Sequence, residues 1–318
     1  MIFKFLIYNL LSCLTLGSLN CPTEKSHSLQ FHLVRQCQRA SANDALALEN
    51  TSSLEECTNL AHELRGLALN YSPGGSKRST NVFEQRPYGK EGQKQQHIRS
   101  RFSVFDQPGE FFNCHVLQCP QNSTFSGMVN DSRFDYYSLY GRPTVVKNYS
   151  CIPEVGLFVV FTQPTVYLNA SLTCTNSSEF IGSLAHIASE HRTKSLAQWL
   201  LQFNRKSQSE RNVFLAFVGL VYNSSTSLNP LDFRNSQKES LNCFLYRAWA
   251  AGHPRLGQEL TNASCVALTP QGTWQTLHCE RELPFVCEMH TARPTSTWDH
   301  SESELDIGPN AAFDCSNN

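Results

Sequence analysis

The pattern of apolar and polar positions in the first half of the chain predicts a capped helix followed by a strand. A capping box pairs a Ser with an acidic residue three positions later, and the candidates here are Ser52 or Ser53 with Glu55 or Glu56. Apolar residues then recur at helical spacing on one face, at Leu54, Cys57, Leu60 or Ala61, and Leu64. Gly66 ends this helix, and Leu67 to Tyr71 form a run typical of a strand.

The second half alternates helical and extended patterns. Cys174 lies near the start of a predicted helix, and Leu184 to Ala188 form a buried extended run. A second helix is predicted from Arg192 to Phe203, with core side chains at helical spacing: Leu196, Trp199, Leu200 and Phe203. Continuous apolar runs predict further strands at 213–222, 244–249, 265–268, 272–274 and 284–288. Helices and strands mix in both halves, so we expect the α+β class.

The first 20 residues have the pattern of a secretory signal peptide. Lys4 precedes an apolar run from Phe5 to Leu16, and the small residues Gly17 and Ser18 supply a cleavage edge. The run is shorter than the roughly 20 residues that span a bilayer, and no second run follows. We expect a secreted, extracellular protein with no membrane insertion.

The cysteine content is compatible with an oxidising compartment. Of 13 cysteines, Cys13 lies in the predicted signal peptide, and the remainder is an even number suited to disulfides. The sequence contains no C-x-x-C pair, which argues against zinc and thioredoxin-like sites. We therefore expect disulfide-stabilised domains and no metal held by cysteines.

Length and charge limit the remaining classes. A chain of 318 residues is long enough for two domains, and its net charge of −1 indicates no polyanionic partner. A basic stretch lies around residues 73–110, but no aromatic residues alternate with its charges, so we expect a flexible insertion and no nucleic-acid site. N-glycosylation sequons occur at Asn50, Asn70, Asn122, Asn130, Asn148, Asn169, Asn176, Asn223 and Asn262.

The segment 21–143 resembles the PAN/apple domain. The resemblance rests on the helix-start motif 53–57 with its Cys57, on the strand 67–71, and on 113–120 and 135–138 as closing strands. The family usually has a second helical cysteine where this chain has Ala61. The resemblance implies a sheet with one helix that makes extracellular protein or glycan contacts and performs no chemistry.

The segment 151–289 resembles a C-type lectin domain, followed by an acidic polar tail at 290–318. Ordered motifs carry the resemblance: Gly182-x-Leu184-Ala185-x-Ile187, 217–220, Trp249-x-x-Gly252-x-Pro254, 265–268, Gly272-x-Trp274 and 284–288. It implies two helices, two small antiparallel sheets and a long loop. It also implies the disulfides Cys174–Cys287 and Cys265–Cys279.

In this family a calcium ion held by carboxylate and amide oxygens binds the sugar. The family's Glu-Pro-Asn or Gln-Pro-Asp motif falls here on His253-Pro254-Arg255, and its Trp-Asn-Asp motif falls on Trp274-Gln275-Thr276. Arg255 is a fixed cation that repels calcium, so we expect no cofactor. A shifted calcium site of Gln275, Thr276 and Glu259 is the alternative. The candidate ligand-loop contacts are His253, Arg255, Gln258, Glu259, Gln275 and Thr276.

The cysteines left over form an odd number in each half: Cys21, Cys37, Cys57, Cys114 and Cys119 in the first, and Cys151, Cys243 and Cys315 in the second. An odd set requires a bridge between the halves, a bridge to another chain, or free thiols. The shortest inter-half candidates join Cys119 or Cys114 to Cys151. The alternative is a disulfide-linked dimer through Cys315.

Three classes of function follow. The first is a secreted recognition or adhesion protein, in an extracellular-matrix or innate-immunity setting of invertebrate type, that binds a protein or matrix glycan without calcium. The second is a calcium-dependent, carbohydrate-binding lectin with displaced ligands. The third is a hydrolase, but the sequence contains no G-x-S-x-G, H-E-x-x-H or P-loop motif, and His186 lies within an apolar run as a core residue. We expect the first class and no enzyme.

Overall fold

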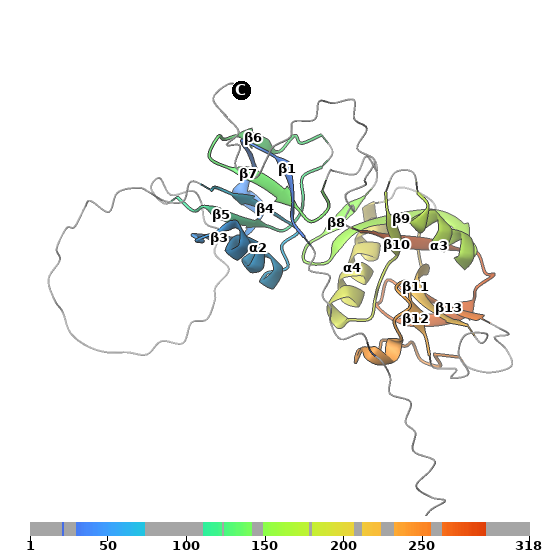
Figure 1. The fold of residues 1–318 in the computed structure, drawn as a ribbon. Helices are drawn as coiled ribbons and strands as arrows, with labels where there is room; N and C mark the ends of the chain where they lie inside the picture. Colours follow the sequence, from blue (N-terminus) through green and yellow to red (C-terminus); the bar gives the residue numbers. More distant parts are fainter. Residues whose placement is uncertain are drawn as a thin grey trace, which may run out of the picture. The chain divides into compact units, whose positions relative to one another are not determined.

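The computed structural model describes residues 21, 30–73, 111–122, 124–141, 149–177, 180–206, 212–223, 232–255 and 263–290. They divide into an N-terminal unit, Phe31–Gly141, and a C-terminal unit formed by the described residues from 149 to 290 together with Cys21 and Gln30 (Figure 1). Several predictions lie outside the described residues: the signal peptide, the basic insertion beyond residue 73, the tail from residue 291, Gln258, Glu259, Cys315, and the sequons Asn148 and Asn262.

The N-terminal unit contains a five-stranded antiparallel sheet covered by one helix. Its strand order is β1-β7-β4-β5-β3. These strands are β1 (His32–Arg35), β3 (Ala45–Glu49), β4 (Ala68–Tyr71), β5 (Cys114–Leu117) and β7 (Asp135–Ser138). Helix α2 (Leu54–Glu63) packs against β4 and β5, and the strands β2 (Gln38–Ala40) and β6 (Met128–Asn130) form a separate pair. The 3₁₀ turn η1 spans Ala42–Asp44.

The predicted capped helix is confirmed. Ser53 is the N-cap of α2, and its side chain accepts a hydrogen bond from the Glu56 N–H at 3.1 Å. The Glu56 carboxylate in turn accepts from the backbone and hydroxyl of Ser52, both at 2.7 Å. These bonds satisfy helix-end donors that would otherwise lack partners, which is why the chain enters the helix here.

The residue that ends α2 is not the predicted Gly66. Arg65, with φ 55°, is the left-handed residue that turns the chain, and the Gly66 N–H donates to Ala61 O at 2.8 Å. Gly66 is needed for space, because a Cβ there would overlap Cγ1 of Val116 on β5. The helix therefore approaches the sheet closely at this point.

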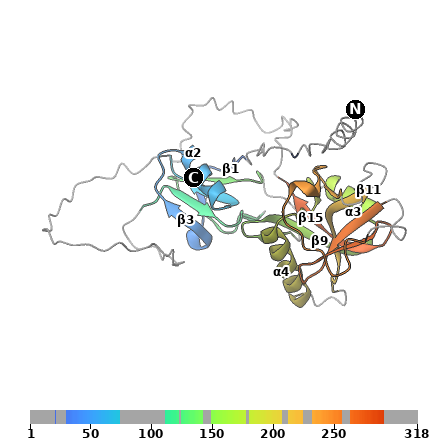
Figure 2. The same ribbon diagram turned by 90° about the horizontal axis from the view of Figure 1, so that it is seen from below.

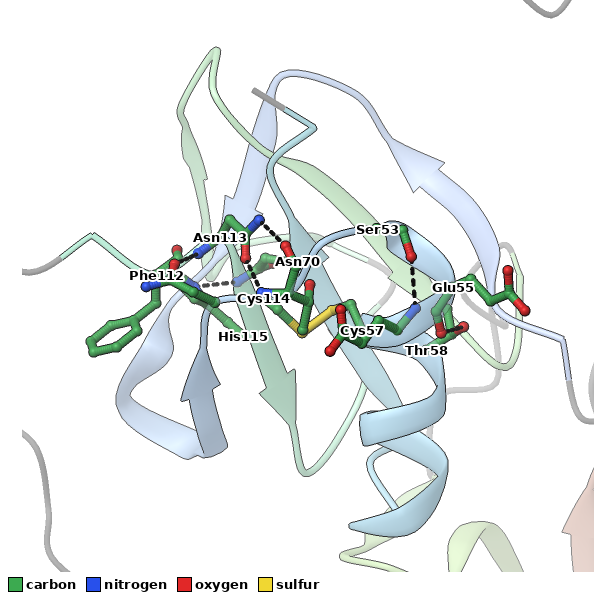
Figure 3. The surroundings of a disulfide bond; sticks show 12 residues. Ser53, Glu55, Cys57, Thr58, Asn70, Phe112, Asn113, Cys114 and His115 are labelled. Carbon is green, nitrogen blue, oxygen red and sulfur yellow. Dashed lines mark hydrogen bonds between the residues drawn. A yellow bond between two sulfur atoms is a disulfide. The ribbon is translucent and has the colours of Figure 1, made fainter. Parts of the chain in front are cut away.

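A disulfide joins α2 to the sheet, as Figure 3 shows. Cys57 and Cys114 are both fully buried and form a bond with a Cα–Cα distance of 5.7 Å. Because Cys114 is bonded to Cys57, the predicted alternative of a Cys114–Cys151 bridge is wrong. Cys37, Cys119 and Cys151 are disulfide-bonded as well.

The C-terminal unit is built on a larger sheet with strand order β14-β13-β11-β15-β9-β8, in which β10 also pairs with β15 and β12 with β11. Figure 2 shows β9 and β15 side by side. The strands are β8 (Ser150–Ile152), β9 (Gly156–Thr165), β10 (Gly182–Leu184), β11 (Ala216–Asn223), β12 (Arg234–Asn235), β13 (Ala263–Leu268), β14 (Trp274–His278) and β15 (Leu283–Met289). The helices are α3 (Tyr167–Thr175), α4 (Glu190–Lys206) and the short 3₁₀ helix η2 (Leu241–Cys243).

The core of this unit lies between α4 and the sheet. Leu196 and Leu200 of α4 are fully buried beside Trp274, and Trp199 and Phe203 pack against the same cluster. The Trp274 indole N–H donates to the Thr193 hydroxyl at 3.2 Å, so the largest core side chain has a polar partner. The prediction that the α4 aromatic residues belong to the core is confirmed.

Two sequence-based predictions for this unit are wrong. The first helix begins at Tyr167, so Cys174 lies near its end instead of its start. The apolar run 244–249 is a loop, in which Trp249 alone makes a bridge to Trp274. Its aromatic side chains pack against the core, and its backbone contacts a strand only at its end, where Ala248 and Trp249 meet Trp274 of β14.

The C-terminal unit is fastened by disulfides that include Cys174–Cys287, Cys265–Cys279 and Cys21–Cys243. The first two are the pairs that the lectin resemblance implies. The third shows that Cys21, placed in the first domain from sequence, belongs with the C-terminal unit. It also removes one cysteine from each odd set.

Candidate functional site

The candidate site is formed where the segment Ala248–Arg255 lies along the edge strand β14. The Trp274 N–H donates to Ala248 O at 2.7 Å, and the Ala250 N–H donates to Trp274 O at 2.9 Å. Further along, at His253 and Thr276, side chains make the contacts between the segment and the strand. The segment therefore covers the free edge of β14 along part of its length.

Thr276 and His253 make the side-chain part of this contact. The Thr276 N–H donates to His253 Nδ1 at 3.0 Å, and the Thr276 hydroxyl lies 2.9 Å from the same nitrogen. That hydroxyl also accepts from the Arg255 N–H at 2.8 Å. Because Nδ1 must carry a lone pair to accept from a backbone N–H, His253 is neutral with its proton on Nε2. We call these three residues the His253–Thr276 lock.

The electrostatics of the lock favour the neutral imidazole. Burial and the positive charge of Arg255 hold the pKa of His253 below its usual value. Thr276 is buried, with 2% of its surface exposed, whereas Arg255 is exposed. The hydroxyl of Thr276 is committed to two partners inside the protein.

These groups do not fit a calcium ion. Calcium takes six to eight oxygen ligands, chiefly carboxylates and carbonyls. The lock instead offers an imidazole nitrogen, one hydroxyl that is already hydrogen-bonded, and a nearby guanidinium. Within the described residues no group of three or more His, Cys, Asp or Glu side chains is placed to hold a metal.

The comparisons with known proteins identify the domain. Residues 163–289 match the family model of the Lectin C-type domain. These residues form a C-type lectin domain. The match does not extend to the N-terminal unit, and no curated protein matches the chain.

Several solved structures are similar to part of the chain. Human lithostathine is 17% identical, with 46% of this chain and 92% of that chain covered and a TM-score of 0.35. The carbohydrate-recognition domain of the mouse scavenger receptor C-type lectin is 18% identical, with 46% and 97% covered and a TM-score of 0.34. The C-type lectin CEL-I from Cucumaria echinata is 14% identical, with 46% and 98% covered and a TM-score of 0.36. The family assignment rests on the family model.

A second feature of the lectin domain, absent from the sequence-based candidates, is the loop Phe244–Ala248. The Arg247 guanidinium donates to three carbonyl oxygens, those of Leu241, Phe244 and Tyr246, each at 2.7 Å. Burial lowers the pKa of Arg247, but these bonds satisfy its charge. Leu245 is 103% exposed, so the loop presents an apolar side chain on a backbone that is held in place.

This feature was missed because the run is apolar and was predicted as a strand. The only sequence signal is an Arg inside an apolar run, which has to be solvated by the chain itself. A lone Arg of this kind does not say which carbonyls it will bind. Only the tertiary fold brings the three carbonyls together.

An ion pair supports the domain on the side of α4. Arg192 of α4 lies 2.5 Å from Glu288 of β15, and its guanidinium also donates to His186 O at 2.9 Å and Val155 O at 3.2 Å. Burial raises the pKa of Glu288, but Arg192 and the His186 N–H outweigh this effect and lower it. Burial and Arg192 lower the pKa of His186, which also contacts Asn235. His186 therefore has partners, as expected of a core residue.

The sequons differ sharply in their accessibility. Asn70 is completely buried, and its carboxamide accepts from the Ala40 N–H and donates to Ala40 O, both at 2.9 Å. A glycan at Asn70 is incompatible with this fold, so the prediction of a glycosylation site at Asn70 is wrong. The exposed sequons among the described residues are Asn50, Asn122, Asn130, Asn169 and Asn176. Nothing is described of the Asn223 side chain.

The described helices include none that is long and apolar enough to cross a membrane.

Of the ligand-loop candidates, the structure brings His253, Arg255 and Thr276 together, and Gln275 lies half-buried beside them on β14. Gln258 and Glu259 lie outside the described residues. The candidate surface is therefore defined by the His253–Thr276 lock, exposed Arg255 and the loop that carries Leu245.

Proposed function

We propose that this protein is a secreted extracellular recognition protein whose C-type lectin domain binds a protein or a matrix glycan without a calcium ion. The observation that carries the proposal is the His253–Thr276 lock. It occupies the loop positions at which the family that the sequence resembles holds calcium, and it uses their polar atoms in internal hydrogen bonds. The domain contributes recognition and no catalysis.

The extracellular location is supported by three independent features. The first 20 residues have the pattern of a signal peptide, the domain contains several disulfides, and most described sequons are exposed. The N-terminal unit is proposed as a PAN/apple-like binding module, because a disulfide pins helix α2 to an antiparallel sheet. Its partner would be an extracellular protein or glycan.

The proposed contact surface includes Arg255 and Leu245. Both side chains are exposed, and both stand on backbone that internal hydrogen bonds fix in place. A preorganised backbone loses little conformational entropy on binding, which favours affinity. The apolar side chain of Leu245 suits a partner with a small apolar pocket, and the positive charge of Arg255 suits a partner with acidic groups.

Binding to arrays of glycans and of extracellular matrix proteins, measured with and without EDTA, tests this function. We expect binding that EDTA leaves unchanged and that Arg255→Ala and Leu245→Ala weaken by at least tenfold. Lys194→Ala is the control, since Lys194 is also an exposed cation and lies on α4. Glycan binding abolished by EDTA, together with a measurable calcium affinity in titration calorimetry, would instead establish a calcium-dependent lectin.

The disulfide-linked dimer through Cys315 is a further proposal about assembly. Electrophoresis of the secreted protein with and without reductant checks it. A doubled mass that reductant abolishes supports the dimer, and a monomer under both conditions excludes it. A Cys315→Ser variant that remains doubled in mass would assign the bridge to another cysteine.

A further inference from the structure

Helix α3 exposes an apolar face that carries no charge. Leu168 is 67% exposed and Leu172 is 46% exposed, and the two residues are one turn apart. The opposite face buries Ala170 and Cys174 against the sheet. None of the side chains from Tyr167 to Thr175 is charged. Figure 1 shows α3 at the periphery of the C-terminal unit.

Two glycosylation sequons lie on the same face. Asn176 follows Leu172 by four residues and so continues the row formed by Leu168 and Leu172. Asn169 precedes Asn176 by seven residues, which is two helical turns and about 10 Å along the axis. Both asparagines are exposed, and neither carboxamide makes a hydrogen bond in the described part of the chain.

The other described sequons are arranged differently. Asn50 and Asn130 each accept a hydrogen bond from another segment, Asn122 accepts one from the Thr124 hydroxyl of its own sequon, and Asn70 is buried. On α3 and at its C-cap, by contrast, two exposed asparagine side chains lie beside two exposed leucines. A carbohydrate chain attached at either position can lie over the apolar carbons and present its hydroxyls to water.

We infer that N-linked glycans on Asn169 and Asn176 cover Leu168 and Leu172, so that the α3 face is a shielded surface and takes no part in recognition. The inference rests on the proposed export of the protein, because N-glycans are added in the secretory pathway. A protein partner is excluded from α3 by two glycans spaced two turns apart. Recognition is thereby confined to other surfaces of the lectin domain.

The test uses the full chain, secreted from eukaryotic cells, with glycan occupancy read by mass spectrometry of its peptides. We expect glycans at both Asn169 and Asn176. The variant Asn169→Gln with Asn176→Gln is compared with a control in which Asn122 and Asn130, two exposed sequons of the N-terminal unit, are changed to Gln. Sedimentation velocity and the fluorescence of an apolar dye measure self-association and exposed apolar surface.

We expect the α3 variant to self-associate and to bind several-fold more dye, and the control to behave as the unchanged protein. Adding Leu168→Gln and Leu172→Gln to the α3 variant should restore both readings. If the α3 variant is not secreted, enzymatic removal of the glycans from the native protein gives the same comparison. Unglycosylated α3 asparagines beside occupied sequons elsewhere would overturn this inference alone, whereas a chain with no glycan at all would contradict export. An α3 variant that matches the control would also overturn the inference.

Discussion

Replacing Arg192 with Met tests whether the ion pair with Glu288 holds α4 to the sheet. The side chains of Arg192 and Glu288 are 21% and 16% exposed, so both charges are largely removed from water. Arg192→Met keeps most of the aliphatic stem but leaves the Glu288 carboxylate without its counter-ion. It also removes the hydrogen bonds to the carbonyls of His186 and Val155.

The magnitude follows from these contacts. Breaking a buried ion pair by removing one partner costs about 3–5 kcal/mol. The residual exposure of the pair lowers this figure, and the two lost hydrogen bonds add about 1 kcal/mol each. We therefore expect the free energy of unfolding of the lectin domain to fall by about 3–4 kcal/mol at pH 7, which lowers the urea midpoint by roughly 1.5–2 M for an m-value of about 2 kcal/mol/M.

Tryptophan fluorescence during urea unfolding measures this domain selectively. Trp199, Trp249 and Trp274 belong to the C-terminal unit, and the sequence from Phe31 to Gly141 contains no Trp. Lys194→Met is the control, because Lys194 pairs with Glu190 on the same helix but both side chains are over 60% exposed. The urea midpoint of Lys194→Met should match that of the unchanged protein, because an ion pair exposed to water adds little stability.

The difference in stability between the unchanged protein and Arg192→Met should depend on pH, with a definite sign. The pKa of Glu288 in the folded protein is lowered from 4.5, so its stabilising contribution is present above that value and is lost as the pH falls through the folded pKa. In Arg192→Met, burial raises the pKa of the unpaired carboxyl, so the variant becomes relatively less stable as the pH rises. The gap between the two proteins should therefore widen from pH 4 to pH 7. A loss below about 1 kcal/mol at pH 7, or a gap that does not change with pH, would refute the reasoning.

Three further changes probe the N-terminal unit. Replacing both Cys57 and Cys114 with Ser removes a disulfide that closes a loop of 57 residues, and should lower the free energy of unfolding of this unit by about 4 kcal/mol. Hydrogen exchange of peptides from this unit should accelerate, while the tryptophan transition stays unchanged. Equal protection from exchange in the variant and the unchanged protein would contradict this. Asp131 pairs with two arginines, Arg133 and Arg39. Their hydrogen bonds, chiefly those of Arg133, lower the pKa of Asp131 to about 2, and Asp131→Asn removes both ion pairs. Since that stability is present above pH 3.8 and is lost as the pH falls through about 2, the variant should be less stable by about 1 kcal/mol at pH 7 and equal near pH 2; a constant difference in denaturation midpoint would count against it. Gly66→Ala places a methyl group against the sheet and should lower the free energy of unfolding of this unit by about 1–3 kcal/mol, measured by the same exchange experiment. Unchanged exchange would show that the helix can shift to make room, and would contradict the prediction.

Local structure in this protein follows from local sequence wherever one turn of chain contains all the partners. The cap of α2 is an example, because Ser53 and Glu56 are three residues apart and their bonds form within the helix start itself. The core positions Leu196 and Leu200 follow from helical spacing in the same way. The order of the lectin motifs was also sufficient to place the domain in its family.

The features that could not be predicted depend on contacts between distant segments. The run 244–249 has the apolar composition of a strand, but its side chains complete the core and Arg247 binds its carbonyls, so no strand forms. Asn70 has an acceptable sequon, yet its carboxamide bonds to Ala40, thirty residues away, in a buried position. The Asn70 outcome has no local signal, and the Arg within the run 244–249 does not by itself say which carbonyls it will bind.

The sequence alone thus determined the capped helix, the helical core positions and the absence of a carboxylate or carboxamide at His253, Arg255 and Thr276, the positions at which the lectin resemblance implies calcium ligands. Residue type decides that last point, since no fold can make a guanidinium into an oxygen ligand. The tertiary structure decided what those residues do instead. By laying Ala248–Arg255 along β14, it brought His253 to Thr276, 23 residues further along the chain, and turned the loop positions into an internal hydrogen-bonded lock.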